Sequence, residues 1–143
     1  MIYRRFGKTG LSMPVLSFGC MRSMHTWNDD NNPSIPNNSN KNLEELVHRA
    51  LSLGITHIET AQGYGSSERQ LGTILPSIPR KDYILQTKVA PTEDPDLFLE
   101  KVRLSMEKLQ VERLDLLGLH GINDHRSLWY SCRKGGCLAA ARK

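Results

Sequence analysis

The sequence has few cysteines and no long apolar run, and each absence excludes a class of protein. Its three cysteines, Cys20, Cys132 and Cys137, are too few and too unevenly spaced for a disulfide framework, a zinc site or an iron–sulfur cluster. No stretch approaches the roughly eighteen consecutive apolar residues of a transmembrane helix, and no apolar segment follows the charged N-terminus as in a secretory signal. We therefore expect a reduced, cytoplasmic protein with no metal and no membrane partner.

The composition and charge are those of an ordinary globular domain. The 143 residues are 38% hydrophobic and 24% charged, which excludes a disordered chain, a collagen and a coiled-coil rod. The net charge is +4, but the basic residues are scattered except near the C-terminus, at Arg133, Lys134, Arg142 and Lys143. No aromatic side chains are interleaved with them, so we interpret them as solvated helix faces and expect no nucleic-acid partner.

Short apolar runs alternate with helical periodicities four times along the chain. Apolar residues recur at helical spacing in stripes that begin at Leu43, Leu71 and Phe98. A stretch rich in Asn, Asp, Pro and Ser, residues 23–40, predicts a long polar loop before the first helix. After a small hairpin around the turn at residues 7–10, the runs that predict strands are 15–19, 55–60, 83–89 and 114–119.

Local signals set the predicted limits of the helices. Asn42 is predicted to cap the first helix, and Gly54 is predicted to end it. Ser66 and Ser67 are candidate caps for the second helix, and Pro95 suits the first turn of the third. The residues after His120 are predicted to begin a fourth helix.

This alternation predicts βαβ units and a parallel sheet, either open and doubly wound or part of a (β/α)8 barrel. The glycines near the first strand, Gly7, Gly10 and Gly19, do not form the Gly-x-Gly-x-x-Gly fingerprint of a Rossmann dinucleotide site. A closed barrel needs eight strands and roughly 250 residues. We therefore predict an α/β fold in which residues 1–143 form an incomplete (β/α)8 TIM barrel, about four βα units preceded by a β-hairpin.

Four polar residues follow or end the later predicted strands: Glu59, Tyr64, Lys88 and His120. Catalytic groups of barrels come from the C-terminal ends of different strands, so these four are candidates for one site. A free phenol holds its proton up to about pH 10, and an ammonium group such as that of Lys88 stabilises the phenolate. Each residue also has a structural interpretation, because a loop tyrosine, a strand-end lysine and a turn-capping histidine are common.

Four motifs, in this order, resemble those of the aldo-keto reductases. They are the opening hairpin and first strand in 6–21, the segment around the catalytic tyrosine in 58–68, the lysine strand at 87–89 and the histidine strand at 114–120. The resemblance implies a (β/α)8 barrel, NADPH as cofactor, and the reduction of a small aldehyde or ketone to an alcohol. It implies that residues 1–143 form the N-terminal half of such an oxidoreductase domain.

The resemblance also implies roles for individual residues. Tyr64 would protonate the substrate oxygen as general acid, while Lys88 and His120 would tune that proton. Glu59, which stands where the family usually has aspartate, would orient Lys88. The nicotinamide pocket would be lined by Gly19, Cys20, Met21 and Glu59.

An alternative to an active reductase follows from what this sequence does not contain. The family's later strands supply the rest of the nicotinamide contacts and the loop that grips the adenosine phosphate. The alternative is therefore a truncated, catalytically inactive half-barrel or gene fragment, or a module that needs a second chain. Unpaired first and fourth strands would then favour self-association through exposed sheet edges, and residues 132–143 end within a helix-like stretch.

Overall fold

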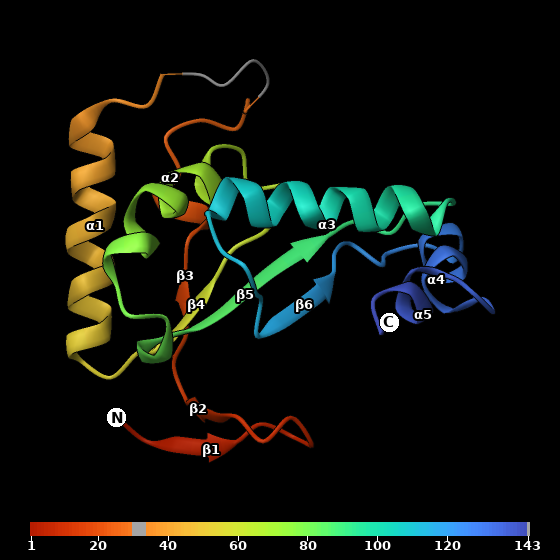
Figure 1. The fold of residues 1–143 in the computed structure, drawn as a ribbon, viewed down its shortest axis with the longest axis horizontal. Coiled ribbons are helices and arrows are strands. Elements are labelled where there is room, and N and C mark those ends of the chain that lie inside the picture. Colours follow the sequence, from red (N-terminus) through yellow and green to blue (C-terminus); the bar gives the residue numbers. More distant parts are fainter. Residues whose placement is uncertain (30–33, 143) are drawn as a thin grey trace.

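A computed structural model describes residues 1–29 and 34–142 and contains a four-stranded parallel sheet (Figure 1). The sheet has the order β3-β4-β5-β6. The sequential order and parallel direction confirm the prediction of a partial barrel, because each strand lies beside the next one along the chain. The strands are β3 (Phe18–Gly19), β4 (His57–Glu59), β5 (Ile84–Val89) and β6 (Leu116–Leu119).

The predicted hairpin is present as a separate antiparallel pair, β1 (Tyr3–Arg5) and β2 (Ser12–Pro14). The Tyr3 hydroxyl donates to the carbonyl oxygen of Gly54 at 2.8 Å, which ties the hairpin to the turn after the first helix. The strand predicted at 15–19 is shorter than expected and less buried, since Val15 and Leu16 are about half exposed. The reason is that β4 pairs only with Phe18 and Gly19, while the Val15 amide donates to the carbonyl oxygen of Ile2, next to β1.

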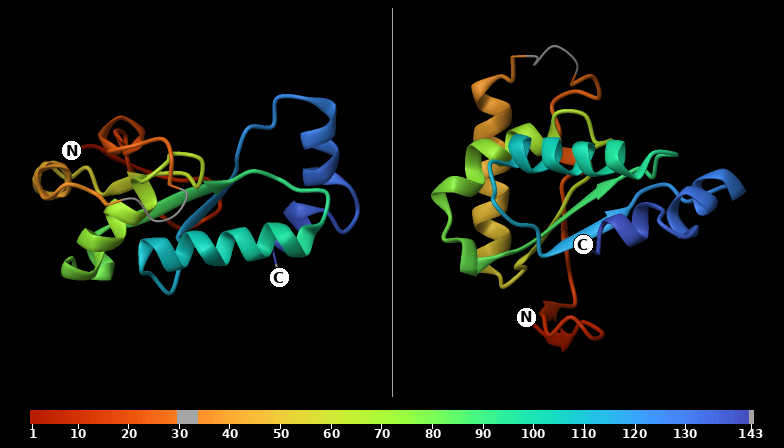
Figure 2. Two further views of the ribbon diagram at one scale, coloured as in Figure 1. Left: turned by 90° about the horizontal axis from the view of Figure 1, so that it is seen from above. Right: turned by 45° about the vertical axis from the view of Figure 1, so that its right-hand side comes forward.

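Five α-helices accompany the strands in the part of the chain that is described. In Figure 2, α1 lies at one side of the sheet, while α4 and α5 lie beyond β6. Short 3-10 helices follow β3 and precede β5, at Met21–Ser23, Leu75–Ser77 and Arg80–Asp82. The α-helices are α1 (Asn37–Ser52), α2 (Ser67–Ile74), α3 (Pro95–Leu109), α4 (His125–Cys132) and α5 (Cys137–Ala140).

The main core lies between the sheet and helices α1 to α3. Along β5, Leu85, Thr87 and Val89 are buried toward the helices, while Gln86 and Lys88 alternate with them and face the other way. Gln86 and Lys88 therefore lie on the face of the sheet that no helix of the described residues covers. The main core includes Leu43, Val47, Ile58, Leu71, Leu85 and Leu109.

The first helix begins earlier than predicted. Residues 37–40 of the predicted 23–40 loop are helical, because the amides of Ser39 and Asn40 donate to the carbonyl oxygen of Pro36 and start the helix there. The predicted cap at Asn42 is therefore wrong. Residues 30–33 of the same predicted loop lie outside the described residues.

Two other helix limits were predicted correctly, and one cap was not. Gly54 ends α1 with φ +79°, and its amide donates to the carbonyl oxygen of Leu51. Pro95 begins α3, with the Asp94 carboxylate as its cap. Ser66 stands at the cap position of α2, but its hydroxyl makes no capping hydrogen bond. That hydroxyl accepts instead from loop amides described below.

The C-terminal region contains two helices separated by a break. Asp124 and Ser127 cap each other across the first turn of α4. The helix ends at Cys132, and Gly135, with φ +72°, separates it from the short α5. The predicted fourth helix is confirmed, but the expected continuous helix-like end is interrupted. Among the described residues, no helix is long and apolar enough to cross a membrane.

Candidate active site

The four predicted site residues come together on the open face of the sheet. Glu59 ends β4, Lys88 is the fifth residue of β5, and His120 directly follows β6. Tyr64 lies in the turn between β4 and α2. Because the strands are parallel and in the observed register, their carboxyl ends meet at one edge, and residues 61 positions apart in the chain become neighbours.

Lys88 is at the centre of this cluster. Its ammonium donates to the phenol oxygen of Tyr64 at 2.7 Å and forms an ion pair with the Glu59 carboxylate. The same nitrogen lies 4.6 Å from the centre of the tyrosine ring. Burial lowers the pKa of the Lys88 amine. Since the phenol oxygen accepts from lysine, its own proton remains free to be donated to a ligand.

His120 also contacts the tyrosine. Its ring meets the Tyr64 ring edge to face, with 5.6 Å between the ring centres. Its amide donates to the carbonyl oxygen of Val89 at 2.9 Å, which fixes the chain as it leaves β6. Burial, and then the charge of Lys88, lowers the pKa of His120. The neutral imidazole is therefore the dominant form at pH 7, and it can donate a hydrogen bond without being a strong acid.

Gly118 provides the space that the lysine side chain occupies. It pairs with Lys88 in the register of β5 and β6. A Cβ atom at Gly118 would lie 2.7 Å from Lys88 Cγ, closer than any ordinary contact. The sequence pattern did not identify this residue, because its importance depends on which residue of the next strand lies opposite.

Three residues after or within β3 were predicted to line a cofactor pocket. Gly19 is exposed, and a Cβ atom there would lie 3.6 Å from an oxygen of Glu59. Met21 is partly exposed. Cys20 has 0% exposure, and burial raises the pKa of its thiol to about 12. Its amide donates to the carbonyl oxygen of Glu59. The predicted lining role of the Cys20 side chain therefore does not match the structure, because that side chain faces the core.

A second polar group on the same face was not predicted. The Ser17 hydroxyl and His57 Nδ1 are 2.7 Å apart, and His57 Nε2 is 3.2 Å from Gln86 Oε1. Burial lowers the pKa of His57, although the hydrogen bond with Gln86 opposes this. Because the amide oxygen can only accept, His57 donates from Nε2 and accepts from Ser17 at Nδ1. The chain of hydrogen bonds links the segment before β3 to β4 and β5.

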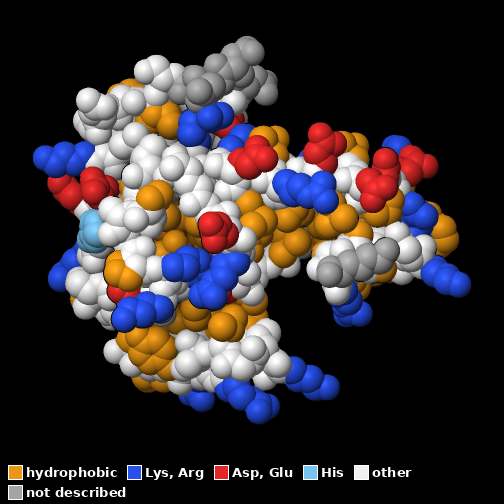
Figure 3. All heavy atoms as spheres, in the orientation of Figure 1, with side chains coloured by type: hydrophobic (Ala, Val, Ile, Leu, Met, Phe, Trp, Pro, Cys, Tyr) orange, Lys and Arg blue, Asp and Glu red, His pale blue; other side chains and the backbone are white. Residues whose placement is uncertain are grey.

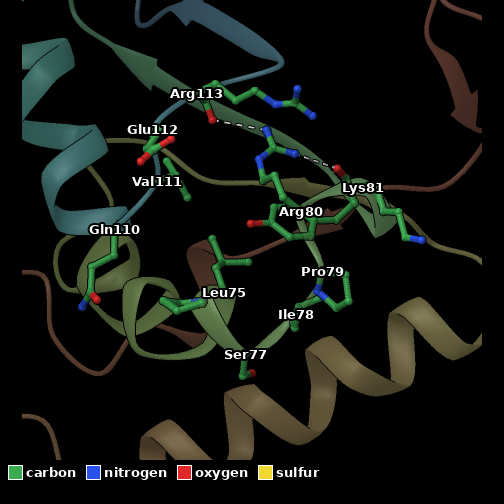
Figure 4. A pocket seen from close by; sticks show the side chains of 12 residues that line it. Leu75, Ser77, Ile78, Pro79, Arg80, Lys81, Gln110, Val111, Glu112 and Arg113 are labelled. Atoms are coloured by element: carbon green, nitrogen blue, oxygen red, sulfur yellow. Dashed lines mark hydrogen bonds between the residues drawn. The ribbon is translucent and has the colours of Figure 1, made fainter.

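A cavity lies elsewhere, at the N-terminal ends of β5 and β6 (Figure 4). Its volume is about 980 Å³, and it is bordered by the connections that precede these two strands, residues 75–83 and 110–113. A smaller cavity of about 480 Å³ lies beside the Tyr64 turn and includes Trp27, Asp29 and Gly63 in its lining. Within residues 1–29 and 34–142, no group of three or more His, Cys, Asp and Glu side chains forms a metal site.

Comparisons with known proteins agree with this arrangement. The sequence model of the Aldo/keto reductase family matches residues 15–128, which is well over half of the chain. A NAD(P)H-dependent 6'-deoxychalcone synthase of Glycine max is 36% identical over 87 residues, which are 56% of this chain and 27% of the relative. Aldehyde reductase YPR1 of Saccharomyces cerevisiae is 34% identical over 115 residues, or 78% of this chain and 31% of that protein.

Solved structures match over almost the whole chain. A putative aldo-keto reductase from Pseudomonas aeruginosa superimposes with a TM-score of 0.79 at 27% identity, covering 99% of this chain and 56% of that one. The thermostable aldo-keto reductase Tm1743, solved with the inhibitor epalrestat, gives a TM-score of 0.69 at 26% identity over 94% of this chain and 51% of that one. The chain thus spans about half of these structures and about a quarter to a third of the two curated relatives.

Proposed function

The chain belongs to the aldo/keto reductase family, and we propose that it carries the proton-transfer half of an NADPH-dependent reductase of small aldehydes or ketones. The observation that carries the proposal is the hydrogen bond of 2.7 Å from the Lys88 ammonium to the Tyr64 hydroxyl. A lysine held against a tyrosine at the carboxyl ends of barrel strands is an arrangement suited to proton donation.

In the proposed reaction, Tyr64 donates its phenolic proton to the carbonyl oxygen of the substrate. The Lys88 ammonium already points at the phenol oxygen and stabilises the negative charge that remains there. Glu59 keeps the ammonium charged and in place through their ion pair. His120, neutral at pH 7 and in contact with the tyrosine ring, donates a hydrogen bond to the same carbonyl oxygen.

The residues beside β3 fit one end of a nicotinamide cofactor. NADPH, when bound, supplies the hydride. Gly19 has no side chain, is exposed and lies next to the Glu59 carboxylate, so a flat ring can lie against it. Met21 and Glu59 would contact that ring. The side chain of Cys20 is buried, and its amide holds this segment in place by donating to the carbonyl oxygen of Glu59. One Aldo/keto reductase of known structure, from Klebsiella pneumoniae, was solved with NADPH.

The proposal includes a reducing cellular compartment and a small-molecule partner. Its cysteines are free, with Cys20 and Cys137 buried, which suits a reducing compartment such as the cytoplasm. Basic side chains lie in several separate places on the face seen in Figure 3, and acidic ones lie among them in its upper part. This distribution supports a small carbonyl compound rather than a nucleic acid as the partner.

The alternative, an inactive half-barrel or a module that needs a second chain, is favoured by one observation. Among the described residues, β3 and β6 each pair with a strand on one side only. Figure 3 shows hydrophobic side chains at the surface beside α3 and β6. Open edges of this kind promote pairing with another chain. We therefore expect residues 1–143 alone to bind NADPH weakly, to show little or no turnover and to self-associate.

The test is a chimaera that completes the barrel. Residues 1–132 are joined to the part of the Pseudomonas aeruginosa protein that follows its structural match, and the reduction of several aldehydes is followed by NADPH absorbance. The proposal predicts turnover in the chimaera, and a fall in kcat of at least about a hundredfold in its Tyr64→Phe variant.

Two controls make the result decisive. NADPH titration by fluorescence checks that Tyr64→Phe still binds the cofactor, because the phenol is not needed for binding. Residues 1–143 without the added half serve as the second control. A folded chimaera that binds NADPH but turns over no aldehyde would contradict the proposal and leave the inactive half-barrel. Turnover by residues 1–143 alone, at low-micromolar NADPH, would contradict the expected need for a second half.

A further inference from the structure

The Asp29 carboxylate receives hydrogen bonds from cations on two helices. Arg69 of α2 donates from Nε to Oδ1 at 3.0 Å and from Nη2 to Oδ2 at 3.1 Å. Lys108 of α3 donates to Oδ2 at 2.7 Å. The aspartate side chain is only 10% exposed, so these bonds are shielded from water. Asp29 therefore ties the segment after β3 to two helices, through residues that are 39 positions apart in the chain.

The segment before Asp29 is bonded through its backbone to the start of α2. The Ser66 hydroxyl accepts from the amides of His25 and Thr26, both at 3.1 Å. In return the Ser66 amide donates to the carbonyl oxygen of Thr26 at 2.9 Å. The amide of His25 also donates to the Gln70 side chain at 2.7 Å. Residues 25–29 are thus fixed at one end by Ser66 and at the other by the Asp29 ion pairs.

Residues 25–29 pack directly against the turn that carries Tyr64. Gly65 has φ +50°, and a Cβ atom there would lie 2.0 Å from the carbonyl oxygen of Thr26 and 2.6 Å from Cα of Trp27. The turn has two backbone hydrogen bonds of its own, from the Tyr64 amide to the carbonyl oxygen of Ala61 and from the Ser67 amide to that of Tyr64, but Tyr64 stands between two glycines, which restrict the backbone little. The packing of residues 26 and 27 against Gly65 therefore adds to these bonds in fixing where the tyrosine lies relative to Lys88.

We propose that Asp29 is a positioning residue for Tyr64, which it holds near Lys88 by clamping residues 25–29 against the Tyr64 turn. The proposal rests on the proton-donor role given to Tyr64 above. Asp29 touches no reacting group and acts only through the segment that it anchors. Its charge is matched to Arg69 and Lys108, so replacing it with a neutral residue leaves two cations without a partner and releases the segment.

The first experiment measures amide hydrogen exchange in residues 1–143 and in the Asp29→Asn variant. We expect the amides of Thr26 and Ser66 to exchange about tenfold faster or more in the variant, while amides in the middle of α1 keep their rates. The second measurement is the NMR signal of the Tyr64 ring in tyrosine-labelled protein, assigned with Tyr64→Phe. This signal should shift in Asp29→Asn and return toward its original position in Asp29→Glu, which keeps the charge.

The matched control is Asp115→Asn, which breaks the ion pair of another largely buried aspartate, the one that Arg80 contacts at the far end of the sheet. It should destabilise the chain without selectively loosening Ser66 or shifting the Tyr64 signal. An unchanged Tyr64 signal in Asp29→Asn would overturn the proposal, as would a uniform increase of exchange along the chain. If Asp29→Asn does not fold, Lys108→Met removes one of the two partners, and the same two readouts decide.

Neither readout depends on turnover, so the two proposals fail separately. If the chimaera is inactive but Asp29→Asn shifts the Tyr64 signal, the clamp stands and the reductase function does not. If the chimaera is active, its Asp29→Asn variant should lose about tenfold in kcat and keep its KM for NADPH. A loss confined to KM for NADPH would show that Asp29 serves cofactor binding and would contradict the positioning role.

Discussion

Two ion pairs at opposite ends of the same sheet have different surroundings. At the carboxyl end, Lys88 pairs with Glu59 and also donates to a tyrosine hydroxyl that faces the open side of the sheet. At the amino end, Arg80 donates to Asp115 at 2.5 Å. It also donates to the backbone carbonyl oxygens of Tyr83 and Arg113 (Figure 4). Besides its carboxylate partner, Lys88 thus contacts a hydroxyl that can exchange a proton, whereas Arg80 contacts backbone carbonyl oxygens that cannot.

The comparison shows that neither an ion pair nor a cavity marks a site by itself. The larger cavity borders the Arg80 pair, where the Asp115 carboxylate also accepts from the amide of Leu85 at 2.8 Å. Those bonds join the connections that lead into β5 and β6, so they stabilise the fold. The Lys88 pair, in contrast, lies beside Tyr64, which in turn contacts His120. Lys88 is therefore suited to proton transfer because it contacts groups that can exchange a proton, and Arg80 is suited to holding the fold together because it contacts the backbone.

The largest expected effect is on catalysis, at Lys88. In the chimaera, Lys88→Met removes the cation that stabilises the phenolate, so kcat should fall by at least about a hundredfold. Steady-state kinetics with an aldehyde substrate measure this. The paired control, Arg80→Met, should keep kcat within about threefold. Equal losses of kcat in the two variants would contradict a catalytic role that is specific to the Lys88 end of the sheet.

A smaller effect is expected on stability, at Arg80. Arg80→Met leaves the Asp115 carboxylate without its cation and two backbone carbonyl oxygens without their donor. The free energy of unfolding should fall by about 2 kcal/mol, since both side chains are mostly shielded from water. Urea denaturation of residues 1–143 measures it. A loss below about 0.5 kcal/mol would mean that this pair behaves as an ordinary surface salt bridge.

The smallest effect is expected at Glu68, a carboxyl between α2 and β5 that is 1% exposed. Thr87 donates to it at 2.6 Å, but burial raises its pKa above the ordinary value of 4.5. The folded state therefore binds the proton more tightly than the unfolded state. The stability that Glu68 contributes is therefore fully present below about pH 4.5 and is lost as the pH rises through the folded pKa of this carboxyl.

Glu68→Gln has no charge to bury and should be more stable than the wild type at pH 7, by about 1 kcal/mol. The Ser105 hydroxyl, close to the same carboxyl, can accept from the new amide. The measurement is the midpoint of urea denaturation from pH 4 to 8. The wild type should lose stability over this range in a way that the variant does not. Parallel curves would show that the Glu68 pKa is not raised.

The local signals of the sequence predicted most of the secondary structure. Gly54 and Pro95 set helix limits through backbone conformations that few other residues adopt, so neighbours along the chain were sufficient to place them. The prediction was wrong where a partner strand was needed. Val15 and Leu16 are apolar and strand-like, yet β4 does not reach them, and they remain exposed. Apolar character alone does not show whether a neighbour is present.

The sequence by itself determined the four βα units and which polar residues end the strands, because both follow from periodicity and from residues close in the chain. Only the tertiary structure decided what those residues contact. Gly118 matters because the register places it opposite Lys88, Cys20 is buried because it packs into the main core, and Asp29 meets cations from two helices. Such contacts join distant segments, and their geometry arises only when the sheet and helices have packed.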